Sequence, residues 1–351
     1  MLTKESFVAI HHLLPFIKPM KDSLQSLYDL LSSKQVTYNT TRTQTYTKQL
    51  TLEDLSNERY IDESLKHDII RLTHCTEVQF TTGQVRFHIL FHHHSKESLE
   101  TLVPVLQYVL SLTTLLGPHT INKVTMNYYL LDSTRVLNDD FVLDKTEVNG
   151  GSCMNMNDSC EISVWRKEEI VKVSIHELIH GLMYDYHEDT PELVSHYLSK
   201  YKLTSDKINS FEGYTELFAE LIHCYLLSHI YTTYNSSIDC YTLFQAFVGL
   251  EIQFSQLQAS KVLNLKQRDP DMNQHTNVLA YYIIKLELYQ SLRQTLAFFE
   301  RYNDSMIKIT DTDRYFDYLT QLRKVKGKKY KVTGYLEITT RMTCLELNLF
   351  E

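Results

Sequence analysis

The chain has 351 residues, of which 43% are hydrophobic and 22% charged, and this ordinary globular composition excludes wholesale disorder. At roughly 150 residues per domain, the length predicts two or three packed units. No apolar run approaches the ~20 residues that a membrane span needs, and the N-terminal segment lacks the basic start and small-residue cleavage site of a secretory signal. We therefore expect a cytoplasmic protein.

The charge of the chain argues against a general affinity for nucleic acid, because 35 basic residues face 43 acidic ones and the net charge is −8. The one strong basic run, residues 323–331, is expected to be a solvated loop. The six cysteines contain no CxxC pair, which predicts reduced thiols in a chain of this length. Cys153 and Cys160 form the one nearby pair, for which a redox or metal role is the lesser alternative.

The periodicity of the apolar residues predicts a mixed α+β chain that is dominated by helices after residue 166. In the first part we expect a helix over residues 1–30, strands over 36–50 and 77–92, a helix over 96–115 and a strand over 122–131. The stretch 77–92 is expected to be a hairpin that turns at Gly83. Further along we expect a polar loop up to residue 151, a strand over 161–165, helices over 166–184, 213–230, 243–257 and 277–301, and strands within 328–349.

The motif that carries chemistry is His176-Glu177-Leu178-Ile179-His180, an HExxH sequence within an apolar helix. Residues i and i+4 share one face of a helix, so both imidazoles can reach a single ion. Glu177 is placed beside such an ion, where it can hydrogen-bond a water molecule. The alternative is a pair of histidines whose hydrogen bonds are satisfied within a core helix.

A catalytic zinc usually takes three protein ligands and leaves a fourth position for water. The pattern HExxHxxGxxH fails here, because Met183 and Tyr186 replace its glycine and its last histidine. A downstream acidic helix supplies the remaining candidates. We expect Glu216 to be the third ligand and Glu220 to accept the second ring N–H of a ligand histidine, with Glu212 as the competing ligand.

The HELIH sequence, followed by YTELFAE at residues 214–220, resembles the gluzincin group of zinc metallopeptidases. TELFAELI is especially similar to the corresponding helix of lethal-factor-type peptidases, and the resemblance covers roughly residues 160–230. It implies one Zn²⁺ per chain, held by His176, His180 and Glu216, with Glu177 as general base. It also implies that a peptide or protein substrate is hydrolysed. The net charge and the lack of a long apolar run, noted above, argue against a nucleic acid or a membrane as partner.

Gluzincins commonly supply a tyrosine or histidine to stabilise the oxyanion, and the candidates here are Tyr214, His275, and Tyr281 or Tyr282. On this basis we expect a zincin-like catalytic domain over residues 119–302. An N-terminal α/β region over 1–118 precedes it, and a tail over 303–351 packs on it. The loop at 149–152 is a further candidate for shaping the substrate cleft.

A protein of a different class remains as the alternative. In that case zinc only joins two helices, and the exposed surface binds a macromolecular partner. Glu177 favours the enzyme, because a structural site needs no base and usually fills its fourth position with another protein ligand.

Overall fold

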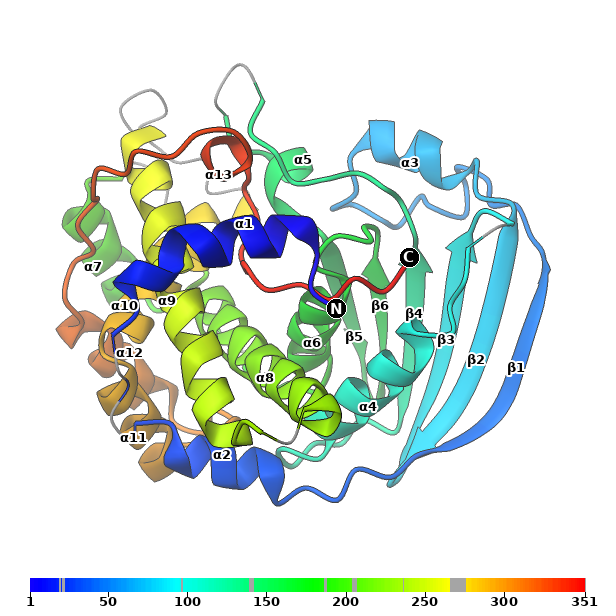
Figure 1. The fold of residues 1–351 in the computed structure, drawn as a ribbon, viewed down its shortest axis with the longest axis horizontal. Coiled ribbons are helices and arrows are strands. Elements are labelled where there is room, and N and C mark those ends of the chain that lie inside the picture. Colours follow the sequence, from blue (N-terminus) through cyan, green and yellow to red (C-terminus); the bar gives the residue numbers. More distant parts are fainter. Residues whose placement is uncertain are drawn as a thin grey trace.

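The computed structural model describes residues 1–18, 20, 23–95, 97–138, 142–185, 188–203, 207–235, 237–265 and 276–350. A mixed sheet lies at one side of the molecule and the helical second half of the chain at the other (Figure 1). The prediction of a mixed α+β chain with a helical second half is confirmed.

The sheet has six strands in the order β1-β2-β3-β4-β6-β5. They are β1 (Asn39–Thr47), β2 (His74–Thr82), β3 (Val85–His93), β4 (Lys123–Tyr129), β5 (Gly151–Met156) and β6 (Ser159–Val164). β4 runs parallel to β3 and β6, and the other neighbours are antiparallel. The predicted hairpin is the β2–β3 turn, where Gly83 has φ +54°, a left-handed conformation that favours glycine.

The helices of the first half are α1 (Lys4–Leu13), α2 (Gln25–Ser32), α3 (Glu63–Ile69), α4 (Leu102–Thr114), α5 (Lys145–Val148) and α6 (Ile170–Gly181). Those that follow are α7 (Pro191–Tyr201), α8 (Ser210–Tyr234), α9 (Cys240–Leu265), α10 (Lys285–Gln290), α11 (Leu292–Tyr302), α12 (Thr312–Gln321) and α13 (Tyr335–Ile338). Every residue from 210 to 228 except Glu212 is buried, so α8 is the central helix, surrounded by α6, α9 and the segment η3 (Leu279–Ile284).

The sheet continues across the expected domain boundary at residue 118, because β3 and β4 pair from Arg86 and Lys123 to His92 and Tyr129. The main core lies between the sheet and the helices, with α4 and α6 packed against the strands. A smaller core under α3 covers the opposite face of the sheet and includes Trp165. The six cysteines are free thiols, as expected.

Several predicted elements differ from the structure. The first helix is interrupted by the short 3₁₀ turn η1 (Leu14–Phe16), which contains Pro15, because proline cannot donate a helical hydrogen bond. The predicted helix over 277–301 consists of the π-helical segment η3, α10 and α11. The predicted polar loop contains the short helix α5, and the strand β5, which was not predicted, begins at the last residue of that loop, Gly151.

The tail over residues 328–349 does not form the predicted strands, and its one regular element is α13. Its N–H groups bind buried carboxylates in place of a neighbouring strand. Those of Cys344 and Leu345 donate to Glu251, and those of Met342 and Thr343 donate to Glu169. None of the helices within the described ranges is long and apolar enough to cross a membrane.

Candidate metal centre

The HExxH residues lie on α6, which packs against β5, β6 and α8. Ile175, Leu178 and Ile179 are completely buried and anchor the helix. Gly151, the first residue of β5, allows the strand to approach Glu177 closely. A Cβ atom at Gly151 would stand 2.6 Å from Glu177 Oε1, which is too close for any larger residue without a shift.

Three side chains from α6 and α8 converge on one point. Nε2 of His176 lies 3.1 Å from Nε2 of His180, and Oε2 of Glu212 lies 3.1 and 3.2 Å from these two nitrogens. Ligand atoms at about 2.05 Å from a tetrahedral ion stand about 3.3 Å apart. The three atoms therefore have the spacing of ligands to a single cation, and the group could hold a metal ion.

Carboxylates hold the other nitrogen of each histidine ring. Glu216 Oε2 lies 2.8 Å from Nδ1 of His176, and Asp185 Oδ2 lies 2.8 Å from Nδ1 of His180. A carboxylate at Nδ1 keeps the proton there and turns the Nε2 lone pair towards the cluster. Both rings are thus oriented as metal ligands are.

The acidic residues of α8 lie one helical turn away from their predicted roles. Glu212, the competing candidate, occupies the position expected of Glu216, whereas Glu216 makes the contact to histidine that was expected of Glu220. Glu220 lies deeper, where its carboxylate pairs with Lys285 and accepts a hydrogen bond of 2.8 Å from Tyr289 Oη. The structure therefore does not bring Glu216 or Glu220 into the cluster.

Two asparagines position Glu212, and sequence reasoning missed both. Asn277 Nδ2 donates to Glu212 Oε1 at 3.1 Å, and Asn209 Nδ2 donates to Asn277 Oδ1 at 2.5 Å. Both have positive φ (+57° for Asn277 and +50° for Asn209), which asparagine tolerates better than most residues. No sequence motif includes these asparagines, so the sequence contains no signal for them. The signal that identifies them is their left-handed backbone conformation in the structure.

Burial and charge set the protonation of the centre. Burial raises the pKa of Glu177, and this effect is larger than the opposite effect of the nearby His176 and His180. The carboxylate of Glu177 is therefore a stronger base than usual. Burial alone would raise the pKa of Glu212, but His180 and His176 hold it below its usual range, so Glu212 is an anion. Burial lowers the pKa of both histidines, yet their carboxylate partners outweigh this effect and raise it.

The centre opens into a cleft of about 970 Å³. Its walls include residues of β5, α7 and the start of α8, together with Tyr281 from η3. The Tyr281 ring meets that of His176 edge-on, with 5.7 Å between the centroids. The cleft is lined by Tyr60, Asn149, Gly151, Ser152, Cys153, Met154, Asn155, His176, Glu177, His180, Asp185, Glu188, Asp189, Val194, Lys207, Ile208, Asn209, Phe211, Glu212, Thr276, Asn277 and Tyr281.

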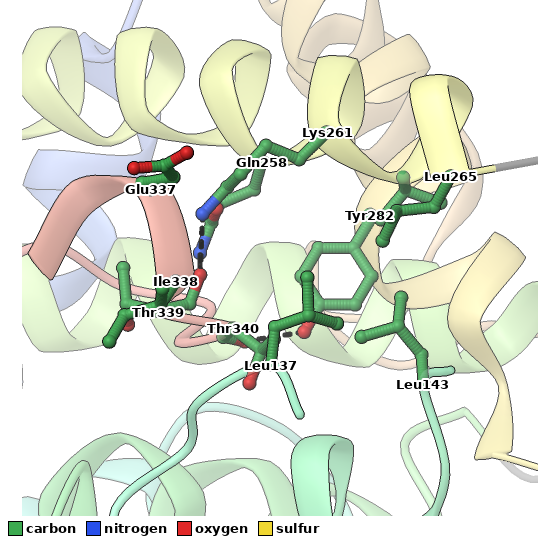
Figure 2. A pocket seen from close by; sticks show the side chains of 11 residues that line it. Leu137, Leu143, Gln258, Lys261, Leu265, Tyr282, Glu337, Ile338, Thr339 and Thr340 are labelled. Carbon is green, nitrogen blue, oxygen red and sulfur yellow. Dashed lines mark hydrogen bonds between the residues drawn. The ribbon is translucent and has the colours of Figure 1, made fainter. Parts of the chain in front are cut away.

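Tyr214 and Tyr282, the other oxyanion candidates among the described residues, do not line this cleft. Tyr214 is buried in the core, where its hydroxyl donates to the carbonyl of Ile307. Tyr282 donates to the carbonyl of Thr340 and faces a separate small cavity beside Lys261 (Figure 2). That cavity measures about 10 Å³, room for about one water molecule, so it is not a substrate site. His275 lies outside the described residues.

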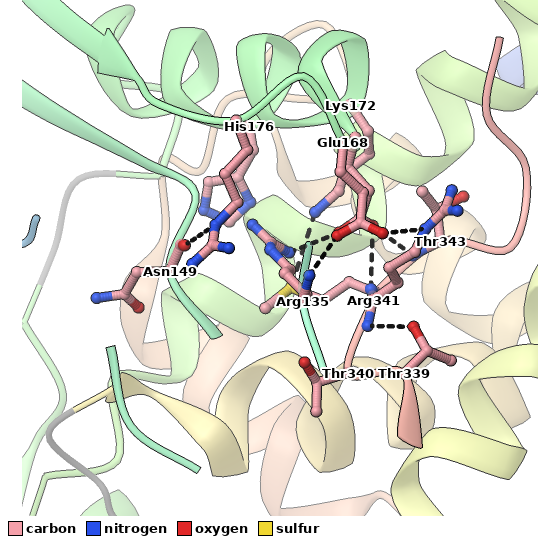
Figure 3. A network of polar contacts seen from close by, with 12 residues as sticks. Arg135, Asn149, Glu168, Lys172, His176, Thr339, Thr340, Arg341 and Thr343 are labelled. Atoms are coloured by element: carbon pink, nitrogen blue, oxygen red, sulfur yellow. Dashed lines mark hydrogen bonds and ion pairs between the residues drawn. The ribbon is translucent and has the colours of Figure 1, made fainter. Parts of the chain in front are cut away.

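A network of buried ion pairs supports α6 from behind (Figure 3). Lys172 Nζ lies 2.8 Å from Glu216 Oε1, and Arg135 Nη1 lies 2.7 Å from Glu169 Oε2. Glu169 immediately precedes α6 and also accepts the N–H groups of the C-terminal tail. Because all four charged side chains are nearly inaccessible, the network fixes the tail and the start of α6 relative to each other.

Comparisons with known proteins return no match: no family model, no curated protein and no solved structure is significantly similar to this chain.

Proposed function

We propose that the chain is a zinc-dependent metallopeptidase with a zincin-like catalytic domain. The observation that carries the proposal is the convergence of His176 Nε2, His180 Nε2 and Glu212 Oε2 at ligand spacing, with Glu177 lining the same cleft. Two imidazoles and one carboxylate are a donor set of catalytic zinc. The surrounding carboxylates fit this assignment, because Glu216 and Asp185 hold the second nitrogen of each ring.

A zinc ion in this position would supply Lewis acidity, which polarises a carbonyl group and acidifies water. Glu177 then accepts a proton from the attacking water and delivers it to the leaving amine. Its raised pKa suits both steps, because a base works best when its pKa is close to the working pH.

Tyr281 is the candidate to stabilise the oxyanion. Burial raises the pKa of its hydroxyl well above the usual value, so the group stays protonated and can donate a hydrogen bond. The cleft also runs along β5, the last strand of the sheet, and an extended peptide can pair with such an edge.

The enzyme is favoured over a protein in which zinc only joins two helices. A structural site is closed by a fourth protein ligand. Among the described residues the cluster has three members, and it faces a cleft large enough for several substrate side chains.

The test compares wild type with Glu177→Gln. Zinc content is measured by elemental analysis, and cleavage of a denatured protein is followed by mass spectrometry. We expect about one zinc per chain in both proteins, with turnover at least 10²-fold slower in the variant. Equal cleavage by both proteins, or a zinc-loaded wild type that cleaves nothing, would overturn the proposal.

A further inference from the structure

The two faces of β5 have different surroundings. Successive side chains of a strand point to opposite sides of the sheet. Gly151 and Asn155 face α6, since Gly151 abuts Glu177 and Asn155 Nδ2 donates to the carbonyl of His180 at 3.0 Å. Met154 and Met156 alternate with these residues and therefore point to the other side.

The two methionines on this second side are exposed, and so is Tyr60 from the segment that precedes α3. Met154 is 51% exposed, Met156 47% and Tyr60 55%, and both Tyr60 and Met154 line the cleft. We call these three residues the apolar rim. Exposed apolar side chains that gather beside a candidate active site indicate a binding surface, and methionine adapts to partners of different shape.

The edge of β5 indicates what would bind beside the apolar rim, namely an extended peptide. Among the described strands β5 pairs with β6 alone, and its residues 151–155 line the cleft, so an extended backbone in the cleft could pair with its other edge. Alternate side chains of a peptide on that edge would stand beside Met154 and Met156, at the roughly 4.5–5.5 Å typical of cross-strand neighbours. The side chains in between would point towards α6, where the lining is formed by polar and ionisable groups such as Glu177 and Asp185.

We propose that the substrates are extended polypeptide segments with large apolar side chains at alternate positions, and that the apolar rim selects them. This inference rests on the proposed peptidase function. It adds a substrate class and assigns Met154 as a specificity-determining residue, because it is the methionine of the rim that lines the cleft.

The test is the cleavage profile of a peptide library, determined for wild type, Met154→Leu, Met154→Lys and Leu14→Ser. Leu14 is an exposed apolar residue of η1 and does not line the cleft, so its variant is the matched control. We expect wild type, Met154→Leu and Leu14→Ser to share an enrichment of large apolar residues at one position. In Met154→Lys this enrichment should fall roughly 10-fold, and acidic residues should gain at the same position.

Two further results separate the inference from the function on which it rests. Cleavage by every protein with the same profile in Met154→Lys would overturn the apolar rim and leave the peptidase intact. A zinc-loaded wild type that cleaves no peptide would overturn both.

Discussion

Glu216 Oε2 lies 2.8 Å from Nδ1 of His176, on the side of the ring that faces away from the Nε2 cluster. The glutamate therefore orients a ligand and does not take part in the cluster itself. Lys172 Nζ, 2.8 Å from Glu216 Oε1, keeps this carboxylate charged although it is completely buried. The first prediction separates this role from that of Glu212.

Glu212→Ala removes one of the three proposed ligand atoms, whereas Glu216→Gln keeps all three and loses only the charge beside His176 Nδ1. We expect Glu216→Gln to weaken zinc binding about 10–100-fold and Glu212→Ala to weaken it more. Competition with a chelator of known affinity measures both. The reverse order of affinities would show that Glu216 is the ligand.

The protonation of the two histidines predicts how metal binding depends on pH. In the metal-free protein their carboxylate partners, outweighing burial, raise the pKa of both His176 and His180. They therefore keep their protons up to a higher pH than free histidines do, and a metal must displace these protons. Zinc affinity should rise as the pH rises through and beyond the ordinary histidine pKa of about 6.5.

The raised pKa values of His176 and His180 also stabilise the metal-free fold, and this stabilisation is complete below a pH of about 6.5. It should be lost as the pH rises through the raised pKa values. Titration calorimetry in buffers with different ionisation enthalpies counts the protons that zinc releases. We expect at least about one proton per zinc near pH 7. Binding without proton release would contradict the assignment of the two histidines.

Which glutamate of α8 meets the two histidines could not be predicted from the sequence, for a physical reason. Glu212, Glu216 and Glu220 follow one another at i and i+4 along one face of α8, so helical periodicity treats them alike. The choice among them depends on the position of α8 along the axis of α6, and tertiary packing fixes that position. His176, Glu177 and His180 lie together on α6 as predicted, because a short apolar helix determines their relative positions locally.

Two other differences have similar causes. β5, with the sequence GSCMNM, has no β-branched residue, and it is a strand because β6 pairs with it. The tail alternates in hydrophobicity, but its N–H groups meet Glu169 and Glu251, so buried carboxylates replace a partner strand. Gly83, between two strand-like stretches, marked the β2–β3 hairpin correctly because a tight turn is a local structure.

The close contact of β5 with α6 predicts a specific role for Gly151. A Cβ atom there would stand 2.6 Å from Glu177 Oε1 and 2.7 Å from Val173 Cγ1. Gly151→Ala should therefore displace Glu177 and lower kcat/KM by up to about 10²-fold while zinc content is unchanged. Gly327→Ala is the control, because its nearest neighbour would be 3.7 Å away. Equal kinetics for the two variants would count against this contact.

The buried ion pair between Lys285 and Glu220 is expected to have a large effect on the free energy of unfolding. Lys285→Met leaves Glu220 buried without its cation, and a broken buried pair costs about 3–5 kcal/mol. Lys285→Met combined with Glu220→Leu should recover most of this loss. Urea denaturation of the metal-free proteins measures both.

An exposed ion pair provides the control for this experiment. Arg71 and Asp68 are separated by 3.1 Å at the surface, so Arg71→Ala should cost less than about 1 kcal/mol. If Lys285→Met and Arg71→Ala unfold at the same urea concentration, the buried pair of Lys285 and Glu220 is not important for stability.

The central claim is that His176, His180 and Glu212 together bind one zinc ion. Anomalous diffraction at the zinc absorption edge, on crystals grown with one equivalent of zinc, tests it most directly. We predict one peak at about 2.0–2.2 Å from His176 Nε2, His180 Nε2 and a Glu212 oxygen. A peak bound to Glu216 in place of Glu212, or no peak between α6 and α8, would contradict the claim.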